Sequence, residues 1–399
     1  MKSHNADARL CRRCNETEVT LKIRAEAICS PCYRRFVNHK TVKRLEVLAK
    51  EISAAPTQTK RILVGLSHGA SSAALIDILN TQLQNQLRRR PSAAFEIIAV
   101  HVDTDLLREE EKEENSSSSP ASQMLQRCST RYPQLRFSRV PLARVLSLDT
   151  VDWAALPSIP ADQEAGARTA EEKVAGLLDR LPSTTSRTDI TRLFVRHVLI
   201  DAARREGCCA VLLGCSTTAL AELTLGETAK GRGFSLPWMV GDGPLVVARF
   251  PAAGSVTRES SAQKLSVYYP NRDLFRSELI QYASLAEPPL TDLICSDTAT
   301  GAASSAVVSH KDVSIDSVMR RYFADVEENY PSIVANVVRT TAKLERRVNA
   351  EEDEEERHCG LCGMGLDELG DERWKGEMGD DGSGKDGRLC YGCSRAVRG

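Results

Sequence analysis

Long apolar runs are missing from this sequence of 399 residues. The longest, such as Ala210–Gly214 and Leu245–Ala248, hold about five residues, whereas a helix that crosses a bilayer needs roughly 20. No apolar stretch precedes the first cysteine pair, so we expect no secretory signal, no transit peptide and a cytoplasmic protein. In a reducing compartment the thirteen cysteines do not form a disulfide framework, and their spacing therefore indicates metal or redox chemistry.

A net excess of charge is missing as well, because 53 basic and 54 acidic residues leave a formal charge of −1. The two ends nevertheless differ. Residues 1–50 hold 12 Lys and Arg against 5 Asp and Glu, whereas residues 351–399 hold 14 acidic against 7 basic residues. A basic arm favours contact with a phosphate backbone, and the acidic run at 351–356 is typical of a solvated linker. The candidates for phosphate contact are Arg12, Arg13, Lys22, Arg24, Arg34, Arg35, Lys43 and Arg44.

Strand-like and helix-like segments alternate along the middle of the chain. Short apolar runs predict strands at residues 62–66, 95–102, 135–140, 210–213 and 245–248. Apolar residues at helical spacing predict helices from about residue 72 and over 190–206, 218–226, 271–285 and 315–347, the last interrupted at Pro331. This alternation favours an α/β fold with a mostly parallel sheet that is covered on both faces.

Composition divides the chain into five regions. We predict a cysteine-rich module at 1–38, a connecting helix at 39–56, an α/β domain at 57–287, a linker and helical region at 288–350, and the acidic run with a second cysteine-rich module at 351–399. Residues 108–122 and 147–187 are predicted to be surface insertions in the α/β domain, because they do not fit a compact sheet.

Eight of the cysteines form two groups with metal-ligand spacing. The pairs are Cys11-x2-Cys14 with Cys29-x2-Cys32, and Cys359-x2-Cys362 with Cys390-x2-Cys393. Two such pairs present four thiolates to one tetrahedral ion, as in zinc ribbons. Since four protein ligands leave no open coordination position, we expect two structural zinc sites. Redox chemistry is the weaker alternative, because neither group opens the helix of a βαβ unit.

A serine-rich loop follows the first predicted strand of the α/β domain and reads Ser67-His68-Gly69-Ala70-Ser71-Ser72. Hydroxyls and backbone N–H groups at the start of a helix can cradle a phosphate. The loop has neither the Gly-Lys-Ser/Thr of a Walker loop nor the three glycines of a GxGxxG motif. A turn capped by Ser71 or Ser72 without any ligand is therefore an equal alternative.

Taken together, the cysteine groups and this loop resemble the cytoplasmic tRNA 2-thiolation proteins, and among them the subunit 2 family, over nearly the whole chain. The resemblance is carried by Cys11-Arg12-Arg13-Cys14, by Ile28-Cys29-Ser30-Pro31-Cys32-Tyr33-Arg34-Arg35-Phe36, by residues 67–72 and by Cys390-Tyr391-Gly392-Cys393. It implies a parallel-sheet, PP-loop ATPase-like (adenine nucleotide alpha hydrolase-like) α/β domain, flanked by N- and C-terminal four-cysteine zinc-ribbon modules.

The chain departs from the pattern of active PP-loop enzymes, which have SGGxDS after the first strand. Ser67, Gly69 and Ser72 match, while His68 replaces a glycine and Ser71 replaces the aspartate. A histidine side chain crowds a loop that must approach phosphate closely, and the lost carboxylate could have helped to organise magnesium. The resemblance therefore makes ATP binding doubtful.

Other active-site features of these enzymes are also incomplete. Residues 214–223 retain the glycine, alanine and glutamate of a GHNxDDxAET motif without its aspartates, and residues 188–192 have no thiol where active relatives have a cysteine pair. Five cysteines remain outside the two groups, and we predict that they are buried apolar residues, although Cys295 lies where the family has a later active-site cysteine. They are Cys128, Cys208, Cys209, Cys215 and Cys295. His101 and Asp103 end the second strand at the edge where such sheets bind ligands, with strand-end solvation as the alternative.

The resemblance implies a subunit of the complex that makes the 2-thio group of 5-methoxycarbonylmethyl-2-thiouridine at wobble position 34 of tRNA Lys, Glu and Gln. It implies a heterodimer with the catalytic subunit 1, and sulfur from a thiocarboxylated ubiquitin-related modifier. This chain would then contribute the tRNA-binding surface, with the eight basic residues named above, and a dimer face. Two alternatives stay open: the chain itself is an ATP-dependent, uridine-adenylating sulfurtransferase, or it is a zinc-ribbon adaptor that does not act on tRNA.

Overall fold

The computed structural model describes residues 10–52, 60–89, 95–106, 120–156, 169–250, 263–295, 313–345, 358–366 and 389–399. Its strands are β1 Leu21–Ile23, β2 Glu26–Ile28, β3 Lys60–Gly65, β4 Phe95–Asp103, β5 Arg136–Pro141, β6 Cys208–Leu213, β7 Gly243–Val247 and β8 Gln263–Tyr268. Its helices are α1 Ser30–Ile52, α2 Ala70–Arg89, α3 Pro120–Arg131, α4 Ala170–Asp179, α5 Thr184–Arg205, α6 Thr217–Ala229, α7 Leu236–Met239, α8 Arg276–Leu285, α9 Ile315–Asn329, α10 Pro331–Thr341 and α12 Tyr391–Arg398. None of the helices in these ranges combines the length and the apolar composition that a bilayer crossing needs.

Six strands form one sheet in the order β5-β4-β3-β6-β8-β7. All neighbours in it are parallel except β7, which pairs antiparallel with β8 at the edge. From the central β3 the chain moves outward to β4 and β5, and then returns to the other side of β3 as β6. The strand order therefore reverses between β3 and β6, and in open α/β sheets such a reversal places the ligand crevice at the carboxyl ends of those two strands.

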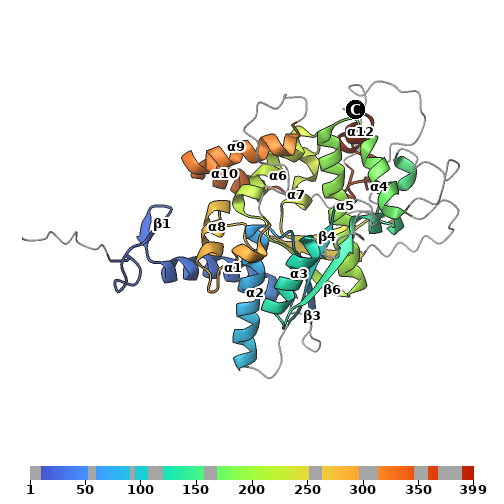
Figure 1. The fold of residues 1–399 in the computed structure, drawn as a ribbon. Helices are drawn as coiled ribbons and strands as arrows, with labels where there is room; N and C mark the ends of the chain where they lie inside the picture. Colours follow the sequence, from blue (N-terminus) through green and yellow to red (C-terminus); the bar gives the residue numbers. More distant parts are fainter. Residues whose placement is uncertain are drawn as a thin grey trace, which may run out of the picture.

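Helices cover both faces of this sheet, as Figure 1 shows. Alternate residues of a strand face opposite sides, and in β3 Leu63 belongs to one buried cluster while Ile62 and Val64 belong to the other. The first cluster includes residues of α4, α5, α6, α9, α10 and the C-terminal module. The second includes residues of the N-terminal module, α1, α2, α3 and α8. The predicted α/β class with a mostly parallel sheet is thus confirmed.

Side-chain caps fix the start of several helices. Ser216 Oγ accepts a hydrogen bond from the Ala219 N–H at 3.1 Å, and Ser183 Oγ accepts one from the Ser186 N–H at 3.0 Å. Such caps satisfy N–H groups that have no partner inside the helix. They place α6 immediately after β6, at the crevice, and they start α5 at Thr184 rather than at the predicted residue 190.

Several predicted boundaries were wrong. Strand β8, which lies between β6 and the predicted fifth strand, β7, was not predicted. The helix predicted over 271–285 begins at Arg276, and the connecting helix predicted from residue 39 begins at Ser30, inside the N-terminal module. The first turn of α1 was not predicted because the helix begins with polar residues. Strand β8 was not predicted because only Leu265 and Val267 show the apolar alternation of a strand.

Residues predicted as a surface insertion at 147–187 are in part core. Val151, Val174 and Leu177 are buried in the first cluster, and a capping box of Thr169 and Glu172 starts α4. Apolar residues at helical spacing in α4 explain the difference, because one helix face packs against the body. The other predicted insertion, 108–122, lies mostly outside the described residues, and its last three residues begin α3. The domain boundaries as a set stay predictions.

Candidate functional sites

The N-terminal cysteines lie close together. The sulfur atoms of Cys11, Cys14, Cys29 and Cys32 are all within 4.8 Å of one another. The β1–β2 hairpin carries the second pair back to the first, and Cys32 lies in the first turn of α1. Burial would raise the pKa of Cys11, but hydrogen bonds from the backbone of Cys14 and Arg13 outweigh it and lower the pKa to about 6. A lowered thiol pKa favours the thiolate form that binds metal.

The C-terminal group has the same composition and is more deeply buried. The sulfur atoms of Cys359, Cys362, Cys390 and Cys393 are also within 4.8 Å of one another, and none of the four residues is more than 2% exposed. The Cys390 N–H donates to Cys359 Sγ at 3.3 Å. Four converging thiols fit a thiophilic metal ion with tetrahedral coordination, and they leave no position for a substrate. Both groups can therefore bind metal, in a structural rather than a catalytic arrangement.

The serine-rich loop after β3 uses its own polar groups. The Gly69 N–H donates to Ser67 Oγ at 3.4 Å, and Ser72 Oγ donates to the Gly69 carbonyl at 3.0 Å. The hydroxyl oxygens of Ser67 and Ser72 are 3.2 Å apart. The Ser71 carbonyl accepts a hydrogen bond from Asn271 Nδ2 at 2.9 Å. The Ser67 and Ser72 hydroxyls and the Gly69 N–H thus have hydrogen-bond partners within the protein.

His68 fills the space above this loop. It has a φ of +56°, a backbone conformation that glycine adopts without strain and other residues rarely adopt. Its side chain is 3% exposed, its ring lies 4.7 Å from the ring of His101, and its carbonyl accepts a hydrogen bond from the Cys295 N–H at 2.8 Å. Burial, and secondarily His101, lower the pKa of His68 to about 4. At neutral pH the imidazole is therefore uncharged and has no electrostatic attraction for an anion.

The segment that follows β6 packs closely against the end of the serine-rich loop, where α2 begins. A Cβ atom added at Gly214, which follows β6, would lie 2.8 Å from the Ser72 Cα. The segment after β6 and the first turn of α2 are thus in close backbone contact at the position where the strand order reverses. His101 Nδ1 is 2.9 Å from the Leu66 carbonyl, and Asp103 forms an ion pair with Arg139. Both strand-end residues are therefore engaged in local contacts.

Of the five remaining cysteines, Cys128 and Cys208 are buried as predicted, whereas Cys209, Cys215 and Cys295 are half-buried. Burial raises the pKa of Cys128 and Cys215 to about 11 and that of Cys208 to about 12. Burial also raises the pKa of Cys209. Thiols with raised pKa values are poor nucleophiles at neutral pH. Cys295 is half-buried and lies beside the serine-rich loop through its backbone contact with His68.

The predicted phosphate-contacting residues separate into two sets. The first set forms ion pairs with carboxylates of this chain: Arg13 with Glu26, Arg24 with Glu278, Arg34 with Glu287 and Arg44 with Asp273. Three of these pairs join the N-terminal module and α1 to residues 273–287, so these arginines dock the module on the α/β body. The second set is exposed and has no acidic partner among the described residues; it consists of Arg12, Lys22, Arg35 and Lys43.

Sequence reasoning did not single out the residues that connect these parts. Asn271 accepts a hydrogen bond from Thr41 Oγ1 at 2.9 Å and donates to the Ser71 carbonyl, and so links α1 to the serine-rich loop. Thr41 and Asn271 are 230 residues apart in the sequence. No local pattern could have indicated this contact. Arg232, which is completely buried, was likewise not predicted to have a role.

Comparisons with known proteins agree with these features. The family model "Cytoplasmic tRNA 2-thiolation protein 2" matches residues 314–380. The protein of that name from Phaeosphaeria nodorum is 36% identical to this chain, and the match covers 99% of this chain and 96% of the relative. The protein of that name from Pyrenophora tritici-repentis is also 36% identical, and the match covers 97% of this chain and 94% of the relative.

A solved structure shares the fold. The U34-tRNA thiolase NcsA from Methanococcus maripaludis, with its 4Fe-4S cluster, superposes with a TM-score of 0.51 and 14% identity, over 90% of this chain and 97% of the thiolase. This likeness supports the PP-loop α/β architecture that the sequence resemblance implied. Because the identity with the fungal relatives extends over nearly the whole chain, the chain belongs to the cytoplasmic tRNA 2-thiolation protein 2 family.

Proposed function

We propose that this chain is a non-catalytic subunit of the cytoplasmic complex that 2-thiolates wobble uridine 34 of tRNA Lys, Glu and Gln, on the way to 5-methoxycarbonylmethyl-2-thiouridine. Membership in the tRNA 2-thiolation protein 2 family supports the tRNA substrate. The buried His68 in the loop after β3 is the observation that supports a non-catalytic role. The adenylation site then belongs to a catalytic partner subunit with which this chain forms a heterodimer.

The loop after β3 is poorly suited to hold the pyrophosphate of ATP. A pyrophosphate carries several negative charges and is held by backbone N–H groups that point toward it, often with a cation nearby. Here the Gly69 N–H donates to Ser67, and the only imidazole in the loop is neutral at pH 7. The backbone contact between Gly214 and Ser72 further narrows the space for phosphate. We therefore propose that the chain binds ATP weakly or not at all.

In this proposal the chain presents part of the tRNA-binding surface. Arg12 and Lys22 project from the N-terminal module, and Arg35 and Lys43 lie on one exposed face of α1, two turns apart. Exposed cations with no acidic partner can neutralise RNA phosphates without first breaking an ion pair. The sulfur donor, a thiocarboxylated ubiquitin-related modifier, would act through the catalytic subunit.

We further propose that zinc occupies both four-cysteine groups. Zinc with four thiolates has no open position and no redox chemistry, which suits a site that only fixes the fold. Metal analysis of the purified chain tests this, with two zinc ions per chain as the expected result. A substantial iron content, or a visible iron–sulfur absorption, would contradict it.

The function is tested by complementation. Cells that lack this chain are expected to lose 2-thiouridine from the three tRNAs, and the wild-type chain restores it. A variant with Gly69→Asp and Ser72→Ala should restore it equally, because Gly69 has space for a side chain and the loop binds no nucleotide. The control variant Arg187→Gln changes an exposed residue of α5 and should also restore thiolation.

Other outcomes separate the alternatives. If only wild type and the control restore thiolation, although the loop variant is folded and soluble, the loop handles nucleotide and the chain is itself an adenylating enzyme. If 2-thiouridine is unaffected by the loss of the chain, the proposal fails and an adaptor role apart from tRNA is favoured.

A further inference from the structure

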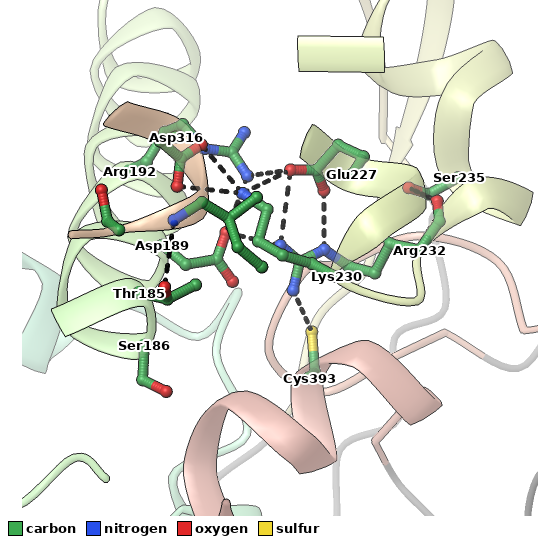
Figure 2. Close-up of polar contacts among 12 residues, drawn as sticks. Thr185, Ser186, Asp189, Arg192, Glu227, Lys230, Arg232, Ser235, Asp316 and Cys393 are labelled. Atoms are coloured by element: carbon green, nitrogen blue, oxygen red, sulfur yellow. Dashed lines mark hydrogen bonds and ion pairs between the residues drawn. The ribbon is translucent and has the colours of Figure 1, made fainter. Parts of the chain in front are cut away.

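A cluster of charged side chains lies between the α/β core and the C-terminal cysteine module (Figure 2), and all of its members are buried except Arg192 and Asp316, which are partly exposed. Its members come from α5, from α6 with the segment after it, and from α9. The acidic members are Asp189, Glu227 and Asp316, and the basic members are Arg192, Lys230 and Arg232. Three negative and three positive charges make the cluster formally neutral.

Arg232 connects this cluster to the cysteine module. Its guanidinium is 0% exposed and donates to Glu227 Oε2 at 2.6 Å and to Asp189. The third nitrogen, Nη1, donates to Cys393 Sγ at 3.8 Å, which Figure 2 shows as the contact between the cluster and α12. The rigid fork of a guanidinium can serve all three partners at once, whereas a lysine ammonium cannot reproduce that geometry.

The surrounding cations lower the pKa of Asp189 and Glu227 and so favour the charged form of these two carboxylates. Burial would raise the pKa of Glu227, but Arg192 and Arg232 outweigh it and lower the pKa to about 2. Lys230 Nζ lies 2.8 Å from Asp189 Oδ1 and 3.0 Å from Asp316 Oδ1. The cation that faces Cys393 is therefore held in place by permanently ionised partners.

The segment around Gly231 and the start of α12 around Gly392 pack so closely that neither glycine has room for a side chain. Gly231 has a φ of +81°, and a Cβ atom added to it would lie 2.4 Å from the Tyr391 ring. A Cβ atom added to Gly392 would lie 2.4 Å from the Lys230 carbonyl oxygen. This close fit fixes the separation between Arg232 and Cys393. The close packing of the two backbone segments therefore keeps Arg232 and Cys393 near each other.

The other end of the module is anchored as well. The Asp152 N–H donates to the Gly360 carbonyl at 2.7 Å, and His197 Nε2 lies 2.7 Å from the Leu361 carbonyl.

Four thiolates with one divalent ion carry a formal charge of −2, which is costly to bury unless donors face the sulfur atoms. In the described part of the chain the N-terminal sulfurs accept a hydrogen bond from the Arg13 backbone N–H but none from a charged side chain.

We propose that Arg232 is a positioning residue for the C-terminal metal: its guanidinium donates to the Cys393 sulfur and thereby couples metal binding at that site to the packing of the module on the α/β core. The inference goes beyond the thiolation function and applies to any thiophilic divalent ion in the site. Because such coupling is reciprocal, an occupied site holds the module on the core, and an intact cluster raises the affinity of the site for metal.

The test uses the full chain loaded with cadmium, whose NMR resonance reports on each four-thiolate site separately. Arg232→Met should shift one of the two resonances and should lower metal affinity at the C-terminal site by about 10- to 100-fold, the usual effect of losing an outer-sphere partner. Arg232→Lys, which keeps the charge but loses the fork, should have an intermediate affinity. The matched control Arg13→Met, beside the N-terminal group, should leave the C-terminal resonance and affinity unchanged.

Two results would overturn the proposal. One is an Arg232→Met chain with wild-type affinity and wild-type resonances at both sites; the other is an equal loss at both sites, which indicates general destabilisation. If Arg232→Met does not fold, hydrogen exchange of the wild-type chain decides. Removing metal from the C-terminal site with a chelator should speed exchange in residues 217–235, and adding metal back should restore protection. Unchanged exchange there would also refute the coupling.

Discussion

Removing the unpaired cations of the N-terminal region should change how salt affects tRNA binding. Glutamine replaces Arg12, Lys22, Arg35 and Lys43 in the chain, which is assayed together with the proposed catalytic subunit. Each phosphate that a protein cation neutralises contributes about 0.7 to 0.9 to the slope of log affinity against log salt. If all four side chains contact phosphate, the slope should fall by about 3, because in the described part of the chain no carboxylate pairs with these residues and competes with the RNA.

The assay is a filter-binding titration of tRNA at several salt concentrations. A control variant loses four exposed cations on or next to α9 and α10 instead: Arg320, Arg321, Arg339 and Lys343. It has the same net charge as the first variant, so general electrostatic attraction changes equally in both. Equal salt slopes for the two variants would refute a specific N-terminal contact, and a slope equal to that of wild type would exclude this surface from the tRNA interface.

Three further predictions concern stability. Burial and His101 lower the pKa of His68 from 6.5 to about 4 in the folded state, so only the unfolded chain gains this proton between those pH values, and stability falls as pH decreases through that window. Asparagine tolerates the positive φ, so His68→Asn should fold but lack this titrating group. Urea titrations should show that the loss of unfolding free energy between pH 7 and pH 4 is smaller in the variant than in the wild type by about 3 kcal/mol. An equal loss in both proteins would show that His68 is not buried and neutral. Asp189→Asn should cost about 3–5 kcal/mol because it leaves three cations facing only two carboxylates in a largely buried cluster, whereas Arg205→Gln, at a surface pair with Asp201, should cost less than about 1 kcal/mol; similar losses would contradict the burial of the cluster. Gly231→Ala should lower the melting temperature because its Cβ meets Tyr391, whereas Gly176→Ala in α4, with open space around its Cβ, should raise it slightly.

Local patterns allowed most of the fold to be predicted. The strands β3, β4 and β6 contain short apolar runs, and α2 and α6 have apolar residues at helical spacing, so their pattern indicates their type without knowledge of their neighbours. The cysteine pairs predicted the two metal sites for the same reason, since two residues between ligands is a property of the local chain. Predictions that needed only local sequence were therefore the ones that held.

The basic residues show why composition alone predicted the interface less well. Arg24 and Arg44 contribute to the excess of positive charge in the N-terminal region exactly as Arg35 does, but they form ion pairs with Glu278 and Asp273. Those carboxylates lie more than 220 residues away in the sequence. A count of charges cannot distinguish a cation that docks a module from one that is available to a ligand; only the folded arrangement can.

The two metal sites differ in a way that follows from the sheet. The N-terminal cysteines pack in the buried cluster on the face of α1, α2 and α8, whereas the C-terminal cysteines pack in the cluster on the face of α5, α6 and α9. A sheet separates these clusters, so loss of one metal perturbs mainly one face. A metal bound by the N-terminal cysteines would then mainly affect the face of the sheet that carries the N-terminal module and its exposed cations. The C-terminal metal, through Arg232, governs the packing of α6, which starts at the carboxyl end of β6.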